Sequence, residues 1–292
     1  MKSLKELYRI GIGPSSSHTI GPRIAAETYL RNHPDAQGFR VTLYGSLAAT
    51  GKGHLTDYAI LQVLGENRTE LIWCPEIVLP FHPNGMKFEV RKNNNDFQDE
   101  WIVYSVGGGA LVEDGKQQTE TPEVYDLDHL SDIQQWCQER GVSYWEYVQH
   151  CEGSEIWDYL EKVWHTMCEA VERGIEHEGV LPGVLKLRRK APDYYIRAMG
   201  YPSNLQSRAF VFAYALAVSE ENASGGTIVT APTCGASGVV PAVLYHLHKT
   251  RNFKEKRILH ALATAGLVGN IAKSRASISG AEAGCQAEVG VA

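Results

Sequence analysis

Four small hydroxyl side chains and a histidine lie together near the start of the chain. The stretch GIGPSSSHTIGPRIAA places Ser15, Ser16, Ser17, His18 and Thr19 directly before a run with helical spacing of apolar residues. One hydroxyl is enough to cap a helix, because a single side-chain oxygen accepts from the unpaired N–H groups of the first turn. Several hydroxyls beside those N–H groups suit a carboxylate, and a histidine adds proton transfer near neutral pH. The stretch therefore fits a helix cap and a ligand site equally well.

A glycine-rich loop carries two further groups that could act on a ligand. The stretch YGSLAATGKGHLTD presents Lys52 and His54 after a strand-like run, before a helix that Thr56 or Asp57 is expected to cap. A plain turn and a loop beside a ligand are both compatible with this pattern. A nucleotide site is disfavoured, because the stretch lacks the G-x-x-x-x-G-K-[ST] pattern of a phosphate loop.

Two isolated cysteines, Cys234 and Cys285, lie in segments rich in glycine and alanine. Cys234 follows Thr230 and Thr233 in TIVTAPTCGASGVVPAVL, at the expected start of a helix. A thiol in that position has a lowered pKa and can be a metal ligand or a nucleophile, whereas burial as a small apolar residue is the plain alternative. The sequence has no C-x-x-C pair, the pattern that would indicate zinc. The two similar loops nevertheless suggest a shared metal site. The other cysteines lie in helix-like or strand-like runs, where burial is expected: Cys74, Cys137, Cys151 and Cys168.

The elements that must position these groups differ between the two halves of the chain. The first half alternates helices and strands, with helices expected over 23–33 and 56–67 and strands over 39–47, 86–93 and 100–114. Glycines 107–109 interrupt the last strand, as a bulge or a close backbone approach would. Beyond about Leu130 the spacing is helical, in the runs 133–141, 144–153, 156–179, 205–226, 237–252 and 254–277. We expect an α+β fold, with an α/β sandwich-like domain over 1–150 and an all-helical domain over 151–292.

The bulk properties narrow the class of protein. The 292 residues carry a formal net charge of −6, which disfavours a nucleic-acid partner. No stretch is long and apolar enough to span a membrane, and the first residues lack the pattern of a secretion signal. A cytoplasmic protein is therefore expected.

Eight segments together resemble the iron–sulfur-dependent L-serine dehydratases, also called L-serine ammonia-lyases. They follow the order of that family from the N-terminus to the last residue: GIGPSSSHTIGPR, YGSLAATGKGHLTD, HPNGMKF, YSVGGGALV, EGVLPG, ALAVSEENASGG, VTAPTCGASGVVPAVL and ASISGAEAGCQAEVGVA. The resemblance implies conversion of L-serine to pyruvate and ammonia, with slower turnover of L-threonine chemically reasonable. It also implies a [4Fe-4S] cluster with three cysteine ligands, whose open iron site acts as a Lewis acid on the substrate hydroxyl. A homodimer is the assembly it suggests.

The same resemblance assigns roles to the residues introduced above. The substrate carboxylate and amine would be held by hydroxyls of Ser15, Ser16, Ser17 and Thr19, with Thr230 and Thr233 as further substrate-binding candidates. His18 and His54 are the candidates for proton transfer, and His54 is favoured as the base that removes the Cα proton, with Lys52 nearby. Cys234 and Cys285 are the candidate cluster ligands.

Two departures from the family pattern lead to specific expectations. Many members have NGACG after the TAPT turn, whereas this chain has CGASG, so Ser237 stands at the usual cysteine position. Positions 234 and 237 share a face if they lie on one helical turn, and we therefore expect Cys234 to be the ligand. The family continues beyond residue 292 with another cysteine and further helices. We accordingly expect a truncated chain with exposed apolar surface, poor solubility and little activity on its own.

Two alternatives remain open at this stage. The first half could persist as a small-molecule-binding domain in a catalytically inactive fragment, and calorimetry would then show serine binding without turnover. A pyridoxal-phosphate dehydratase would need a lysine Schiff base and a phosphate loop, an arrangement that Lys52 and glycines 107–109 do not form. Borohydride reduction followed by mass spectrometry would detect a pyridoxyl-lysine in that case.

Overall fold

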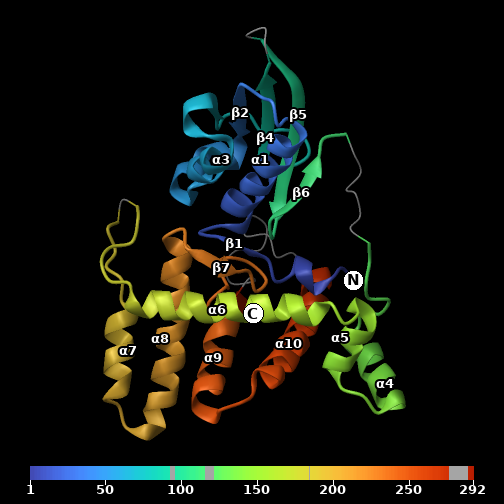
Figure 1. Ribbon diagram of the computed structural model, residues 1–292, viewed down its shortest axis with the longest axis vertical. Helices are drawn as coiled ribbons and strands as arrows, with labels where there is room; N and C mark the ends of the chain where they lie inside the picture. The colour runs from blue at the N-terminus through green and yellow to red at the C-terminus, as the bar shows by residue number, and fades with distance from the viewer. Residues whose placement is uncertain (93–95, 116–121, 184, 276–288) are drawn as a thin grey trace. The chain divides into compact units, whose positions relative to one another are not determined.

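The computed structural model describes residues 1–292 except 93–95, 116–121, 184 and 276–288 (Figure 1). Its contacts divide the chain into two compact units. The sheet unit comprises Gly13–Glu120, and the helical unit comprises Met1–Ile12 and Thr121–Ala292. The expected α+β class, a sheet domain followed by a helical one, is confirmed. The division into 1–150 and 151–292 stays a prediction about the family's domains and does not coincide with these compact units.

The sheet unit is built on five strands in the order β3-β2-β4-β5-β6. Only β2 and β3 run parallel, and the other neighbouring pairs are antiparallel. The strands are β2 (Gly38–Tyr44), β3 (Thr69–Cys74), β4 (Gly85–Arg91), β5 (Phe97–Gly107) and β6 (Ala110–Glu113). The helical segments are η2 (Ser16–Ile20), α1 (Gly21–Asn32), α2 (Gly45–Thr50), η3 (Gly51–His54), α3 (Thr56–Leu64) and η4 (Glu66–Arg68).

The core of the sheet unit lies between one face of the sheet and the helices α1 and α3. Alternate residues of β2 and β4 point to that face and are fully or almost fully buried, as the two-residue period of a strand requires. They pack with Tyr29 of α1 and with Ile60 and Leu64 of α3. The buried strand residues are Phe39, Val41, Leu43, Met86, Phe88 and Val90. The result is a two-layer α/β sandwich, as expected.

The expected strand over 39–47 ends earlier, at Tyr44. At Gly45 the backbone φ is +48°, and a Cβ there would lie 2.6 Å from the carbonyl oxygen of Pro83. Glycine is the residue that tolerates both conditions, so the chain can turn here from β2 into α2. The turn places Ser46 in the first turn of α2, directly beyond the end of β2. The bulge expected near glycines 107–109 is confirmed as a register shift between Ser105 and Gly107.

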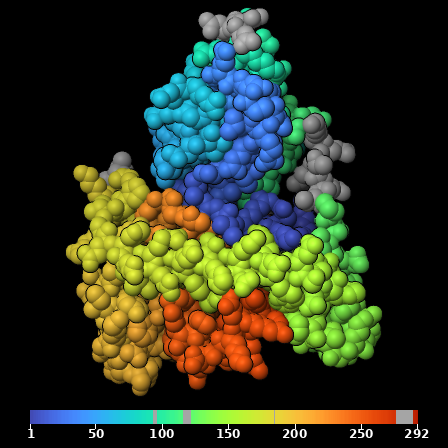
Figure 2. Space-filling view, viewed as in Figure 1, coloured from blue at the N-terminus to red at the C-terminus, as the bar shows by residue number. Residues whose placement is uncertain are grey.

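The helical unit consists mainly of helices that pack against the long helix α6, which crosses one face of the unit (Figures 1 and 2). Its helices are η1 (Leu4–Glu6), α4 (Leu130–Arg140), α5 (Tyr144–Glu152), α6 (Ile156–Glu176), α7 (Ala191–Met199), α8 (Ser203–Ala223), α9 (Val239–Arg251) and α10 (Glu255–Arg275). It also contains a two-stranded ribbon, β1 (Ile10–Ile12) antiparallel to β7 (Thr227–Val229), which the all-helical expectation did not include. Strands of three residues are too short to produce a periodic signal in the sequence. Among the described residues, no helix is long and apolar enough to cross a membrane.

A buried charge network fixes the loop between α6 and α7 to α8. Glu221 is 3% exposed, and its carboxylate accepts hydrogen bonds from Arg189 at 2.8 Å, His177 at 2.8 Å and Arg173 at 3.2 Å. Burial alone would raise the pKa of Glu221, but these three donors together lower it below its ordinary value. Glu221 is therefore charged in the folded chain, and it compensates the almost fully buried guanidinium of Arg189.

We expect Glu221→Gln to destabilise the helical unit by about 3–5 kcal/mol, because it leaves the buried Arg189 charge without its counter-ion. The free energy of unfolding in urea measures this effect. Glu169→Gln is the matched control, since Glu169 lies on α6, is exposed and is 3.7 Å from Arg173. That control should change the free energy by no more than about 0.5 kcal/mol. Equal effects of the two substitutions would show that burial of the network contributes nothing.

Candidate active site

The SSSHT stretch forms a π-helical turn, η2, at the start of α1. Ser15 precedes the turn, and its backbone oxygen accepts from the N–H of Ile20 at 3.1 Å. The Ser15 hydroxyl accepts from the N–H of His18 at 3.2 Å, so it caps this turn and not α1 itself. A Cβ on Gly21 would lie 2.2 Å from Ser105 Oγ, which shows how closely the turn approaches β5. Single π turns within helices are frequent at functional sites, and this one adjoins the first residue of α1.

The imidazole of His18 is held between two hydroxyl groups. Its Nδ1 lies 2.9 Å from Ser17 Oγ, and its Nε2 lies 3.2 Å from Ser46 Oγ. The ring centroid is 4.7 Å from that of His54. Burial, followed by the nearby imidazoles of His54 and His82, lowers the pKa of His18 to about 4, although a hydrogen bond with the backbone of Ser46 acts in the opposite direction. His18 is therefore neutral at physiological pH.

The depressed pKa of His18 predicts how stability depends on pH. In the unfolded chain the group titrates near its ordinary pKa of about 6.5, so between about pH 6.5 and pH 4 the unfolded state binds the additional proton. Stability of the sheet unit should therefore fall as pH decreases through this window. We expect His18→Gln to flatten the corresponding slope of Tm against pH, as measured by calorimetry. An unchanged slope in the variant would contradict the assignment.

Two threonine hydroxyls fix the backbone around the histidines. Thr19, fully buried, donates to the carbonyl oxygen of His54 at 2.7 Å and accepts from the N–H of Ser15 at 3.1 Å. Thr56 donates to the carbonyl oxygen of His18 at 2.5 Å. The expected cap of α3 by Thr56 or Asp57 is wrong, because Leu55 occupies the cap position in a left-handed conformation. The hydroxyl of Thr56 is used instead to join the two loops that carry the histidines.

Within the described part of the chain, one ring nitrogen of His54 has a hydrogen-bond partner and the other has none. Its Nδ1 lies 3.0 Å from the carbonyl oxygen of Thr50, and a carbonyl can only accept, so the proton of the neutral ring is on Nδ1. The lone pair of the neutral ring is then on Nε2. Lys52 is exposed, and its ammonium lies 5.5 Å from the centre of the Trp73 ring. Of the two, His54 has the free acceptor that a base requires.

Three residues at this site were not singled out from the sequence. Ser46 contacts His18 directly, and His82 lies near enough to contribute to the lowered pKa of His18. Asn84 is buried; its side-chain N–H donates to the carbonyl of Ser105 at 3.2 Å, while its Oδ1 has no partner among the described residues. The sequence signals for His82 and Asn84 were the HPNG turn before β4, which has an ordinary turn composition, and its place in the HPNGMKF segment of the family resemblance.

The second group of candidates lies in the loop that joins β7 to α9, in the helical unit. Thr230 donates to the carbonyl oxygen of Leu7 at 2.7 Å and accepts from the N–H of Arg9 at 2.9 Å, so its hydroxyl continues the β1–β7 ribbon. Thr233 and Ser237 are each 1% exposed, and their hydroxyl oxygens have no hydrogen-bond partner in the described part of the chain. The loop therefore holds two buried polar groups on either side of Cys234.

Cys234 and Ser237 lie on one turn, as the spacing suggested. The N–H of Ser237 donates to the carbonyl oxygen of Cys234 at 3.2 Å, and the thiol residue is 1% exposed. A thiol in a glycine-rich turn next to unpartnered hydroxyls suits a cysteine-ligated metal group, so the described residues of this loop fit one ligand position of an iron–sulfur cluster. Cys285, the other candidate ligand, lies outside the described residues.

The four remaining cysteines lie on regular elements, as expected. They are Cys74 on β3, Cys137 on α4, Cys151 on α5 and Cys168 on α6. Cys137 is buried and the other three are partly exposed. Burial, with help from Glu172, raises the pKa of the Cys168 thiol to about 12, and burial also raises the pKa values of Cys137 and Cys151. Raised thiol pKa values disfavour the thiolate that metal binding requires.

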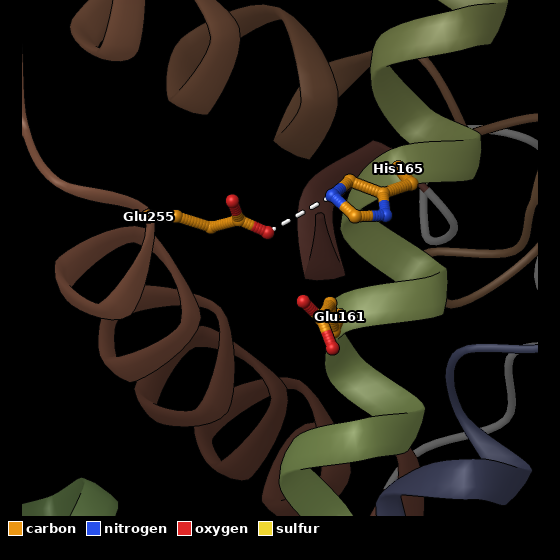
Figure 3. Close-up of side chains that lie close together, drawn as sticks. All are labelled: Glu161, His165 and Glu255. Carbon is orange, nitrogen blue, oxygen red and sulfur yellow. Dashed lines mark ion pairs between the residues drawn. The ribbon is translucent and has the colours of Figure 1, made fainter.

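A different set of potential metal ligands lies between α6 and α10 (Figure 3). Glu161, His165 and Glu255 bring their ligand atoms within 4.8 Å of one another, and His165 Nε2 lies 3.0 Å from Glu255 Oε1. The set has no thiol, and its side chains are largely exposed. It therefore does not suit an iron–sulfur cluster, and its contacts are those of a surface ion pair.

Comparison with known proteins gives concordant results along the whole chain. The sequence pattern of the family described as Serine dehydratase beta chain matches residues 3–72, and that of Serine dehydratase alpha chain matches residues 66–292. The L-serine dehydratase TdcG of Escherichia coli strain K12 is 35% identical over 350 residues, covering 100% of this chain and 76% of the relative. The chain belongs to the serine dehydratase family. The resemblance inferred from the eight sequence segments is thus confirmed.

Other serine dehydratases show the same relationship. The L-serine dehydratase of Mycobacterium bovis is 37% identical over 346 residues, covering 99% of this chain and 75% of the relative. That of Helicobacter pylori is 32% identical over 349 residues, with 99% and 76% covered. The similarity thus includes both the SSSHT stretch of the sheet unit and the Cys234 loop of the helical unit.

Proposed function

We propose that this chain is a lyase that deaminates L-serine to pyruvate and ammonia with a [4Fe-4S] cluster that Cys234 helps to hold. Membership in the serine dehydratase family supports the reaction class. The observation that carries the cluster assignment is the Cys234 turn, with a buried thiol between two buried hydroxyls that lack partners among the described residues. When bound, the cluster supplies a Lewis acid for the departing hydroxide of the substrate.

His54 is the proposed base that removes the Cα proton. The carbonyl of Thr50 fixes the proton of the neutral ring on Nδ1, so Nε2 is available to accept. Thr19 holds the backbone oxygen of the same residue, which limits movement of the loop. The imidazole of His18, 4.7 Å away, is neutral at physiological pH and therefore adds no positive charge of its own beside a protonated His54.

The serine hydroxyls are proposed to bind the substrate carboxylate and amine. Ser15 and Ser17 are partly exposed, and their side-chain oxygens lie 3.4 Å apart. Ser16 is buried, and the hydroxyls of Thr19 and Thr230 are each engaged with two backbone groups, so these three are weaker candidates than the sequence suggested. Thr233, buried and without a partner among the described residues, remains a candidate in the helical unit.

Calorimetry with L-serine, run beside an ammonia assay on the anaerobically reconstituted chain, tests this proposal. Binding accompanied by ammonia release supports the lyase, with L-threonine expected to react more slowly. Binding without ammonia would instead support the ligand-binding fragment, an alternative that no described feature favours. A homodimer and a cytoplasmic location stay predictions.

A further inference from the structure

Four side chains of the sheet unit form a continuous chain of hydrogen bonds through His18. Ser46 Oγ lies 3.2 Å from Nε2 of the ring, and Nδ1 lies 2.9 Å from Ser17 Oγ. Ser17 Oγ in turn lies 3.4 Å from Ser15 Oγ. Of the four hydrogen-bonded side chains, Ser46 is the one with no role in the proposed function. The purpose of its contact with His18 therefore needs an explanation.

The position of the single proton on the neutral His18 ring decides which group donates in each of these hydrogen bonds. A neutral imidazole donates at one nitrogen and accepts at the other, whereas each hydroxyl has one hydrogen to donate. If Ser17 donates to Nδ1, its hydrogen is used and the ring donates to Ser46 through Nε2. If Nδ1 carries the proton, Ser17 accepts from the ring, its own hydrogen is free, and Ser46 must donate to Nε2.

A carboxylate selects between these two arrangements. A carboxylate only accepts, so a hydroxyl that binds it must donate to it. Ser17 can donate to a carboxylate only in the second arrangement, with the ring proton on Nδ1. In that arrangement the hydroxyl of Ser46 is the donor to Nε2, whereas in the first arrangement the ring donates toward Ser46, whose backbone also hydrogen-bonds the ring.

We propose that Ser46 is a positioning residue for substrate binding, which donates to Nε2 of His18 and thereby leaves the Ser17 hydroxyl free for the carboxylate of L-serine. This inference rests on the proposed function. Ser46 itself does not touch the substrate. The backbone of Ser46 is fixed separately, because its N–H donates to the carbonyl oxygen of Pro83 at 3.0 Å, so loss of the hydroxyl leaves the helix start in place.

Ring-nitrogen NMR of the chain labelled at histidine tests the proton position. With L-serine bound, we expect the proton of His18 on Nδ1, and Nε2 as an acceptor. A bound state with the proton on Nε2 would overturn the inference and leave the proposed function intact. Failure of L-serine to bind would overturn both, which separates the two cases.

Kinetics of Ser46 variants provide the second test. In Ser46→Ala the unbound ring can carry its proton on either nitrogen, whereas the bound state requires the proton on Nδ1 without the donor that favours this tautomer, so the cost falls on binding. We expect KM for L-serine to rise roughly five- to tenfold and kcat to stay within about twofold. Ser46→Thr retains the hydroxyl and should restore KM.

The matched control is Thr69→Val. Thr69 lies at the start of β3, opposite the start of β2, and its hydroxyl bonds the carbonyl of Gly65 at 2.8 Å. Thr69 therefore lies at the opposite end of these strands from Ser46, and its substitution should leave KM unchanged. A fall in kcat with unchanged KM in Ser46→Ala would contradict a positioning role, as would an unchanged KM or a failure of Ser46→Thr to restore it.

Discussion

Replacing Cys234 with serine is expected to abolish assembly of the iron–sulfur cluster. Cys234 is the one cysteine of the described residues that lies in a glycine-rich turn, and it is 1% exposed beside the unpartnered hydroxyls of Thr233 and Ser237. A serine oxygen is a poorer ligand for iron in such a cluster than a thiolate. Iron and acid-labile sulfide per chain, measured after anaerobic reconstitution, should fall from their values in the unaltered chain to background.

Two controls separate ligand loss from a general effect of substitution. Cys168→Ser removes a thiol of α6 whose pKa is raised to about 12 by burial, and it should leave the iron content unchanged. Ser237→Ala removes the hydroxyl at the position where many relatives are expected to have cysteine, and it should also retain iron. Normal iron content in Cys234→Ser, or an equal loss in Cys168→Ser, would refute the assignment of Cys234 as ligand.

Replacing His54 with glutamine is expected to lower kcat by about 10²–10⁴-fold, the usual contribution of a general base. The substitution removes the Nε2 acceptor that the Thr50 carbonyl leaves available on the neutral ring. Because His54 and Cys234 lie in different units of the fold, the iron content should not change. Steady-state pyruvate formation and iron analysis of the same preparation measure the two effects.

His33→Gln is the matched control for His54. His33 follows α1, and its Nδ1 lies 3.0 Å from the carbonyl oxygen of Tyr29, a local contact at the end of that helix. Its replacement should leave kcat unchanged. If His54→Gln retained full activity, the base would have to be another group.

The sequence predicted the elements whose residues follow a regular period. The helices α1 and α3 and the strand β4 have apolar residues at the spacing of a buried face, and the structure confirms them. The five-strand order and the parallel pairing of β2 with β3 were not predicted, because they depend on contacts between distant segments. The ribbon of β1 with β7 was missed for the same reason, since it joins residues 10–12 to 227–229.

In the candidate site, too, contacts between distant segments could not be predicted from the sequence. Residue types and motifs singled out His18, His54 and Cys234 as candidates, because few other groups have suitable chemistry. The roles of hydroxyls could not be read in this way: Thr56 was expected to cap a helix but bonds the His18 carbonyl. Thr230 stays a predicted substrate-binding residue, although its hydroxyl bonds Leu7 and Arg9. A hydroxyl donates to whatever acceptor the fold brings near it, so its role appears only in the folded chain.

Pyruvate formation from L-serine, compared between the anaerobically reconstituted chain and the same chain kept free of iron, tests the central claim most directly. The account predicts pyruvate above background in the reconstituted chain alone, because the cluster supplies the Lewis acid for loss of the hydroxyl. Pyruvate at equal rates in both preparations would contradict cluster-dependent chemistry. Absence of pyruvate from a preparation with a full complement of iron and sulfide would contradict the assignment of serine deamination to this chain.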